Sequence, residues 1–259
     1  MIFDLINTDP GFVSSHNLEY LPGAGTYPFL SVDSRDDFEK SLRVKPEDWY
    51  YRNNPVEYRL NSQQFRTKEF KDIDWKNSIV ILGCSLTFGV GVTEEHTIAS
   101  YLQEITGKYV VNLGHPGLTN GLIAYNSYYL KENYPTPLSV VNLWTHMVRS
   151  FYITPKTMRL EVKNFKSISV KDMNTIITNN IMWMKMSNAL WKDHPNHVQL
   201  CLHDYFNDGK PIAMAQKVFP EVIQLKESWQ KDESARDNWH WGKETCEEIA
   251  KLIASNIKL

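Results

Sequence analysis

Short apolar runs that alternate with amphipathic helical segments constrain the fold of this chain more than any other feature. The run Ile79–Leu82 is typical of a strand buried on both faces, and apolar residues then recur at helical spacing from Ile98 to Ile105. Further strands are predicted at 109–113, 138–144 and 198–202, and further helices at 120–132, at 173–184 and from 243 onward. This alternation predicts an α/β fold, a parallel sheet with right-handed crossovers and helices on both faces.

The residues before this pattern differ from it in composition and in the spacing of their apolar residues. Residues 1 to about 70 carry much of the Pro, Asn, Asp and Tyr and show no sustained period. We therefore interpret 1–75 as an irregular N-terminal extension packed on a main domain at 76–259. Its simplest role is to cover sheet edges, and a lid or a dimer contact are alternatives. The sequence does not determine the oligomeric state.

Composition and charge exclude several classes of protein. The net charge of −2 leaves no basic field for a nucleic-acid backbone. No run approaches the roughly 20 apolar residues of a membrane helix, and Met1–Pro10 lacks the pattern of a secretory signal. The odd set Cys84, Cys201 and Cys246 has no CxxC spacing, so neither a disulfide framework nor a zinc site is indicated. We expect a cytoplasmic protein with no nucleic-acid partner and no membrane span.

The stretch Ile79–Val92, "IVILGCSLTFGVGV", points to chemistry, because α/β proteins place their sites beyond the carboxyl ends of parallel strands. Ser85 follows such a strand, but a serine hydroxyl needs a base and an orienting carboxylate. The segment "ARDNWHWGKETCEEIA" places Asp237 three residues before His240. A tight turn would bring the carboxylate to Nδ1 and leave Nε2 facing the serine. The predicted catalytic residues are Ser85, Asp237 and His240.

Two of these residues also have simpler interpretations, and a neighbouring cysteine is an alternative nucleophile. Ser85, taken alone, is better explained as a small residue that closes a strand and caps the next element. His240 beside Trp239 and Trp241 is alternatively a capping or core histidine. Cys84 is an alternative nucleophile, since a thiolate needs less activation. Adjacent residues usually point to different sides, so Cys84 and Ser85 cannot easily share one histidine.

Three segments in this order resemble the blocks of the SGNH, or GDSL-type, hydrolases. "ILGCSLTFGVGV" resembles their first block, Gly-Asp-Ser followed by a hydrophobic residue, and "VVNLGHPGLTN" resembles the second. "ARDNWHWG" resembles the last block, Asp-x-x-His, and "YRLNSQQFRTKEF" is similar to a stretch that precedes the first block in many bacterial and phage members. The resemblance covers about 57–257. It implies a three-layer α/β/α sandwich with a parallel, flavodoxin-like central sheet, the SGNH hydrolase fold.

The resemblance also implies an oxyanion hole, with two departures. The family would use the backbone N–H groups of Ser85 and Gly114 and an asparagine amide. Cys84 stands where the family has an aspartate that braces the loop. "VVNLWTHMVRS" offers Thr145 and His146 where the family has Gly-x-Asn-Asp, so His146 falls at the asparagine position and a neutral imidazole N–H can replace the amide. Asn142 is a second candidate that lies mid-strand.

The function predicted from this resemblance is that of a serine esterase acting on an acyl ester, with a carbohydrate O-acetyl ester as the expected class. The partner would be a small-molecule or glycan ester, and no metal or organic cofactor is required. An O-acyltransferase on the same fold is one alternative. A catalytically impaired relative that binds a glycan or a protein is the other, because of Cys84 and His146.

Other polar and apolar clusters are given ordinary roles. His194, His197 and His203 lack the spacing of a metal site and are interpreted as surface histidines. Arg149 is expected in a surface ion pair rather than in contact with an anionic substrate. Met182, Trp183, Met184 and Met186 are expected to fill the core rather than to wall an acyl pocket.

Overall fold

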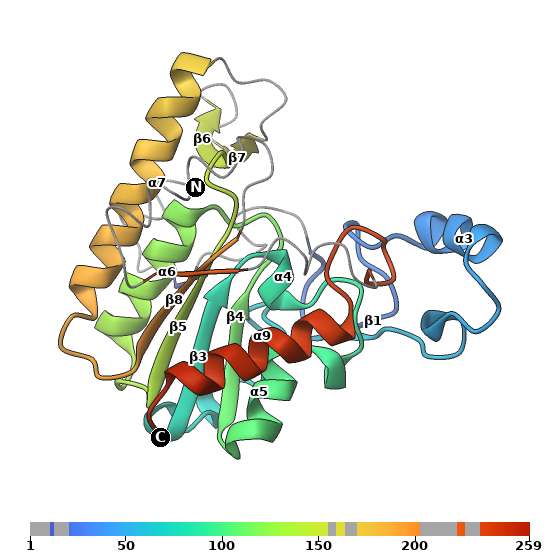
Figure 1. Ribbon diagram of the computed structural model, residues 1–259, viewed down its shortest axis with the longest axis horizontal. Coiled ribbons are helices and arrows are strands. Elements are labelled where there is room, and N and C mark those ends of the chain that lie inside the picture. The colour runs from blue at the N-terminus through green and yellow to red at the C-terminus, as the bar shows by residue number, and fades with distance from the viewer. Residues whose placement is uncertain (1–10, 13–20, 155–158, 164–169, 203–221, 226–233) are drawn as a thin grey trace.

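A five-stranded parallel sheet forms the centre of the molecule (Figure 1). The computed structural model describes residues 11–12, 21–154, 159–163, 170–202, 222–225 and 234–259. The strands are β3 (Ser78–Gly83), β4 (Tyr109–Gly114), β5 (Ser139–Trp144), β8 (His197–Cys201) and β9 (Ile223–Gln224). Their spatial order is β4-β3-β5-β8-β9, with every neighbouring pair parallel. This is the flavodoxin-like order, so the predicted sheet is confirmed.

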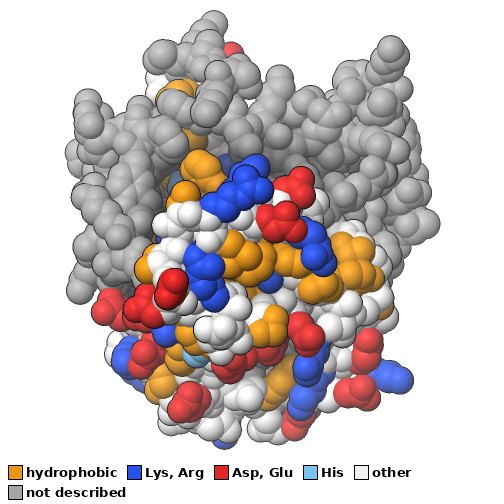
Figure 2. Space-filling view, turned by 90° about the vertical axis from the view of Figure 1, so that its right-hand side faces the viewer, with side chains coloured by type: hydrophobic (Ala, Val, Ile, Leu, Met, Phe, Trp, Pro, Cys, Tyr) orange, Lys and Arg blue, Asp and Glu red, His pale blue; other side chains and the backbone are white. Residues whose placement is uncertain are grey.

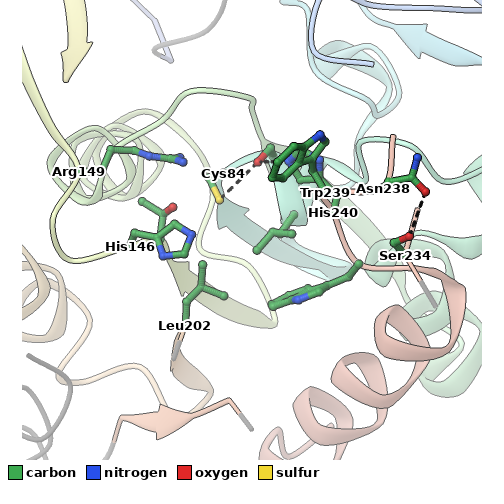
Figure 3. A pocket seen from close by; sticks show the side chains of 12 residues that line it. Cys84, His146, Arg149, Leu202, Ser234, Asn238, Trp239 and His240 are labelled. Atoms are coloured by element: carbon green, nitrogen blue, oxygen red, sulfur yellow. Dashed lines mark hydrogen bonds between the residues drawn. The ribbon is translucent and has the colours of Figure 1, made fainter. Parts of the chain in front are cut away.

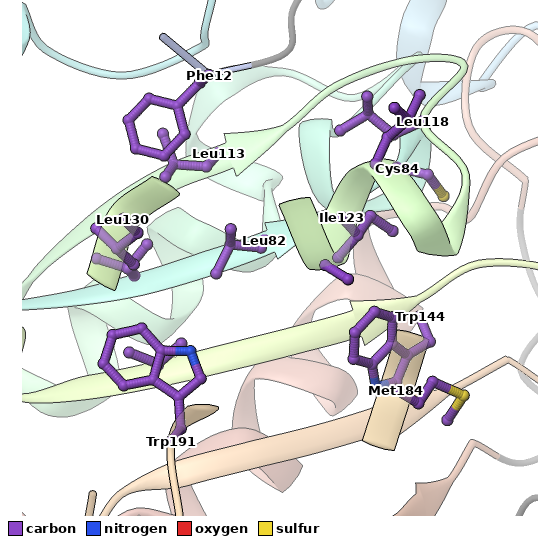
Figure 4. Packing of buried hydrophobic residues seen from close by; sticks show 14 of the residues in the cluster. Phe12, Leu82, Cys84, Leu113, Leu118, Ile123, Leu130, Trp144, Met184 and Trp191 are labelled. Atoms are coloured by element: carbon purple, nitrogen blue, oxygen red, sulfur yellow. The ribbon is translucent and has the colours of Figure 1, made fainter. Parts of the chain in front are cut away.

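Two layers of helices cover the two faces of the sheet. One face carries α6 (Asn120–Asn133) and α7 (Val170–Leu190), and the other carries α5 (Ile98–Thr106) and α9 (Lys243–Asn256) (Figure 1). The alternation along β3 divides its side chains: Val80 and Leu82 join the cluster under α6 and α7, while Ile79 and Ile81 join the cluster under α5 and α9. Figure 4 shows the first cluster. The predicted α/β/α sandwich is therefore confirmed.

The structure adds elements that the sequence pattern did not indicate. A two-stranded antiparallel ribbon of β6 (Ser150–Thr154) and β7 (Arg159–Lys163) follows β5, in a stretch that looked irregular. The helix α4 (Ser85–Phe88) follows β3 directly. In α7, Met184 is buried as expected, but Met182 and Met186 are exposed. None of the helices in the described ranges is both long and apolar enough to cross a membrane.

The N-terminal extension contains regular structure. Strand β1 (Gly25–Tyr27) pairs antiparallel with β2 (Tyr58–Leu60), and the helix α3 (Arg35–Val44) lies far from α7 (Figure 1). Three short 3-10 helices lie at Tyr50–Arg52, Phe70–Asp72 and Trp75–Asn77. Helix α3 begins at Ser34, whose hydroxyl accepts a hydrogen bond from the Asp37 N–H at 3.2 Å, a local capping signal that the lack of long periodicity concealed. The division into domains at residue 75 stays a prediction.

An aromatic cluster joins the extension to the main domain. Trp49, Tyr51 and Tyr58 pack there against Phe88 and Val90, which follow β3. On the face shown in Figure 2, the described Lys and Arg side chains are interspersed with Asp and Glu. That face therefore presents charges of both signs next to one another.

Candidate active site

Ser85 lies at the carboxyl edge of the sheet because two glycines let α4 start there. A Cβ on Gly83 would lie 1.9 Å from Thr87 Oγ1, and a Cβ on Gly114 would lie 2.4 Å from the Phe88 N. Only a residue without a side chain permits so close an approach. The tight connection places Ser85 as the first residue of α4, directly after Cys84.

Ser85, His240 and Asp237 are brought together although Ser85 is 155 residues from His240. His240 Nε2 lies 2.8 Å from Ser85 Oγ, and His240 Nδ1 hydrogen-bonds Asp237 Oδ2. The other carboxylate oxygen, Asp237 Oδ1, accepts from the backbone N–H groups of Trp239 and His240, both at 3.1 Å. The Asp237 side chain is 3% exposed and that of His240 is 20% exposed. The carboxylate therefore orients a ring whose second nitrogen faces the serine.

The turn that carries Asp237 and His240 docks on the glycine-rich segment after α4. The Arg236 N–H donates to the Gly91 carbonyl at 2.9 Å, and the Ala235 N–H donates to the His240 carbonyl at 3.0 Å. Gly91 has φ +77°, and a Cβ there would lie 2.8 Å from the Ala235 Cβ. The glycines that follow Ser85 thus let two distant segments of the chain meet.

A buried ion pair ties the same turn to the N-terminal extension. Arg236 Nη2 lies 2.6 Å from Asp33 Oδ2, and both side chains are nearly inaccessible to solvent. Arg236 Nη2 also donates to the Pro28 carbonyl at 2.7 Å. The Tyr58 hydroxyl donates to Asp33 and accepts from the Gly91 N–H at 2.8 Å. The extension therefore braces the residue immediately before Asp237.

The loop after β5 is held by buried asparagines. Asn120 at the start of α6 donates to the Thr145 carbonyl at 3.1 Å and accepts from the Thr145 N–H at 2.8 Å. Asn180 of α7 donates to the carbonyls of Met147 at 2.6 Å and Arg149 at 3.2 Å. Backbone groups at three points of the loop are thereby satisfied, which presents its side chains in a defined position.

His146 is presented by this loop to the same site as His240. Burial, with smaller effects from Arg149 and His240, lowers the pKa of the His146 imidazole to about 4. The ring is therefore neutral at pH 7 and carries one N–H. His146 Nδ1 is buried and has no hydrogen-bond partner among the described residues.

Gly114, Cys84 and Asn142 are placed differently from His146. The Gly114 N–H donates to Asn112 Oδ1 at 2.9 Å, so this amide is engaged within the chain. Asn142 is fully buried in β5 and donates to Ser187 Oγ at 2.6 Å. Cys84 Sγ packs in the core 4.0 Å from Ser85 Oγ, while His240 contacts the serine. Of the expected oxyanion donors, Ser85 and His146 border the pocket.

A pocket of about 330 Å³ opens in front of these residues (Figure 3). It is lined by Cys84, Ser85, Leu86, Thr145, His146, Arg149, Leu202, Ser234, Asn238, Trp239, His240 and Trp241. Two of these lining residues were not predicted for the site: Arg149, for which a surface ion pair was expected over contact with an anionic substrate, and Trp239, which is 89% exposed. The adjacency of Trp239 to His240 was the available signal for the tryptophan.

The histidines considered as metal ligands lie elsewhere. His194 Nε2 is 2.9 Å from the Pro137 carbonyl. His197 is partly buried at the start of β8 and lies 3.4 Å from Asn142 Nδ2, so it is in a strand and not in the surface loop that was expected. His203 lies outside the described residues. Within the described ranges no group of three or more His, Cys, Asp or Glu side chains is arranged to hold a metal ion.

No family model and no curated protein matches the chain. Similar solved structures include a lipolytic G-D-S-L family member from Veillonella parvula, at 10% identity and a TM-score of 0.41, covering 69% of this chain and 94% of that one. A carbohydrate acetylesterase family member from Sinorhizobium meliloti has 13% identity and a TM-score of 0.41, with 69% and 99% covered. AlinE4, an SGNH-hydrolase family esterase, has 10% identity and a TM-score of 0.37, with 60% and 77% covered. These similarities concern the fold.

Proposed function

We propose that this chain is a divergent SGNH-type serine esterase that cleaves an acyl ester with Ser85, His240 and Asp237. The observation that carries the proposal is the 2.8 Å contact of Ser85 Oγ with His240 Nε2, backed by the hydrogen bond of Asp237 to Nδ1. A histidine oriented in this way is the base that a serine hydroxyl needs in order to attack a carbonyl. The contact favours an enzyme over an impaired binding relative.

In the proposed mechanism, Ser85 Oγ attacks the ester carbonyl carbon while His240 Nε2 accepts the hydroxyl proton. Asp237 holds the tautomer and stabilises the imidazolium. His240 then gives the proton to the leaving alcohol, which leaves an acyl-serine. Water attacks this acyl group as His240 removes its proton, and the acid departs as the proton returns to Ser85 Oγ. If a second alcohol attacks the acyl-serine in place of water, the product is a new ester, as in an acyltransferase.

The negative charge on the tetrahedral intermediate needs hydrogen-bond donors. We assign this role to the Ser85 backbone N–H and to the neutral imidazole of His146, which both border the pocket. The Gly114 amide, which the family resemblance implied, donates to Asn112 instead. Gly114 thus serves the site by letting α4 pack against β4.

The finer proposal is that the substrate is an O-acetyl ester of a carbohydrate. The exposed indole of Trp239 stands next to His240 and offers a flat apolar face with a polar edge. A pocket of about 330 Å³ suits a small acyl group with part of its alcohol.

The test is covalent labelling with a fluorophosphonate probe, which reacts with activated serines. Native protein is expected to be labelled, and Ser85→Ala and His240→Ala are expected to lose the label. Ser255→Ala is a matched control, because this serine lies in the last turn of α9, at the opposite end of the sheet from the pocket. A well-folded native protein that takes no label would overturn the proposal. If native protein is labelled, measuring acetate release from acetylated sugars tests the proposed substrate class.

A further inference from the structure

Arg149 borders the pocket and has no acidic partner among the residues that the structure describes. Its guanidinium group points toward Cys84 (Figure 3), and Cys84 Sγ is 4.0 Å from Ser85 Oγ. The residues that line the pocket include no Asp or Glu, and within the described part of the chain no ion pair involves Arg149. Among the residues that the structure describes, the expected surface ion pair of Arg149 is not found.

The guanidinium group of Arg149 has more donors than the described residues satisfy. Arginine carries five N–H donors, and the side-chain hydrogen bond seen here is Nη1 to the Leu118 carbonyl at 3.5 Å, the outer limit of such contacts. The side chain is half-buried, so it has given up part of its hydration. By contrast, Arg66 and Arg236 each meet several acceptors. An arginine left open toward a pocket is suited to bind acceptors supplied by a ligand.

The backbone holds Arg149 in place for such a role. The Arg149 N–H donates to the His146 carbonyl at 3.1 Å, and the Arg149 carbonyl accepts from Asn180 at 3.2 Å. His146 lies on the same loop and borders the same pocket, and the positive charge of Arg149 contributes to the low pKa of its imidazole. The pocket therefore combines a fixed cation with the proposed nucleophile, base and oxyanion donor.

We propose that Arg149 binds an anionic oxygen group of the substrate, so that the chain cleaves esters of acidic molecules. This inference rests on the proposed esterase function and narrows its substrate class. A carboxylate fits the planar fork of the guanidinium with two parallel hydrogen bonds, and sulfate or phosphate shares the same chemistry. The acidic group belongs either to the alcohol, as in an acetylated acidic sugar, or to the acyl part, in which case the acyl group is not the acetyl group proposed above.

Two matched pairs of chromogenic esters separate these cases. 4-Nitrophenyl acetate and 3-carboxy-4-nitrophenyl acetate differ by a carboxylate on the alcohol, while 4-nitrophenyl hexanoate and mono-4-nitrophenyl adipate differ by one on the acyl group. Native protein is expected to prefer the acidic ester of one pair by at least tenfold in kcat/KM. Arg149→Gln is expected to abolish that preference through KM, and Arg149→Lys to retain part of it because it keeps the charge but loses the fork.

The control variant is Arg59→Gln, because Arg59 is exposed on β2 and contacts Glu57 at 3.6 Å. It is expected to leave the preference of the native protein unchanged. Equal kcat/KM for both members of each pair would overturn the inference, and so would a loss of kcat in Arg149→Gln that is the same for neutral and acidic esters. The latter result would assign Arg149 to the transition state instead.

Binding without turnover keeps this inference separate from the esterase proposal. Ser85→Ala lacks the nucleophile but retains the rest of the pocket lining. Calorimetric titration is expected to show tighter binding of the acidic ester than of its neutral partner, and addition of Arg149→Gln is expected to remove the difference. Binding of both esters with equal affinity would overturn the inference even if native protein takes the phosphonate label. If native protein takes no phosphonate label but Ser85→Ala still binds the acidic ester more tightly than the neutral one, the esterase proposal alone would be overturned.

Discussion

At the scale of single residues, the site depends on side chains whose partners are far away in sequence. His146 has the burial and the neutral charge of a hydrogen-bond donor but not the residue type that the resemblance led us to expect. An imidazole is larger than an asparagine amide, and it donates from one nitrogen only when it is neutral. The low pKa of His146, about 4, keeps its imidazole in that neutral form at pH 7.

Replacing His146 tests the proposed oxyanion donor. His146→Ala is expected to lower kcat by about 100-fold to 1000-fold, the usual effect of removing one such donor, with a small change in KM. His146→Asn is expected to recover part of kcat because its amide N–H can donate. Steady-state kinetics on a neutral ester provide the measurement. A variant His146→Ala that keeps its kcat within about twofold would remove His146 from the proposed hole.

At the scale of elements, the N-terminal extension and the turn that carries Asp237 and His240 are joined by direct contacts. In the extension, Asp33 and the Pro28 carbonyl bind the guanidinium group of Arg236. The Tyr58 hydroxyl accepts a hydrogen bond from the Gly91 N–H. Asn238, which has φ +63°, donates in addition to Ser41 Oγ of α3. We expect the extension to position His240 rather than to serve as a lid.

Breaking the ion pair tests this positioning role. Arg236→Met leaves Asp33 as an unpaired buried charge, so the free energy of unfolding is expected to fall by about 3–5 kcal/mol and kcat is expected to fall with it. The double variant Asp33→Leu with Arg236→Met is expected to regain most of the stability, because no charge is left buried, but only part of kcat. Urea unfolding and kinetics below the melting temperature separate the two effects. Full recovery of kcat would show that the pair acts on stability alone.

At the scale of the whole molecule, two partly buried histidines couple folding to pH. Burial, with a smaller effect from His194, lowers the pKa of His197 to about 4, and His146 has a similar value. Both groups bind protons more weakly in the folded than in the unfolded chain, whose histidines titrate near 6.5. Their stabilising contribution is therefore complete above about pH 6.5 and is lost as the pH falls toward 4.

Replacing one of these histidines tests the pH dependence of the free energy of unfolding. Between pH 6.5 and 5, the free energy of unfolding of the native chain is expected to fall by up to about 1.4 kcal/mol per pH unit for each such histidine. His197→Gln is expected to reduce this slope by the contribution of one histidine, up to about 1.4 kcal/mol per pH unit. Urea unfolding at several pH values measures it. An unchanged slope in the variant would show that His197 is not protonated during acid unfolding.

The sequence by itself determined those features that neighbouring residues encode. Apolar periodicity predicted the strands and helices around the sheet, because burial on one or both faces imposes a period on adjacent side chains. The three-residue spacing of Asp237 and His240 predicted their contact, since a single turn spans it. The position of Ser85 after a buried strand predicted the edge of the sheet at which it lies. These are all short-range relations.

Tertiary structure alone decided which distant segments meet. It paired Asp33 with Arg236 across 203 residues, engaged the Gly114 amide with Asn112, and left Arg149 in the pocket without an ion pair in the described part of the chain. The capping signal of α3 was local, but the contact of α3 with the turn that carries Asp237 and His240 was not. The physical reason is that parallel strands bring their carboxyl ends together through crossovers whose loops have no fixed period. The partners of a side chain on such a loop depend on the packing of all layers at once.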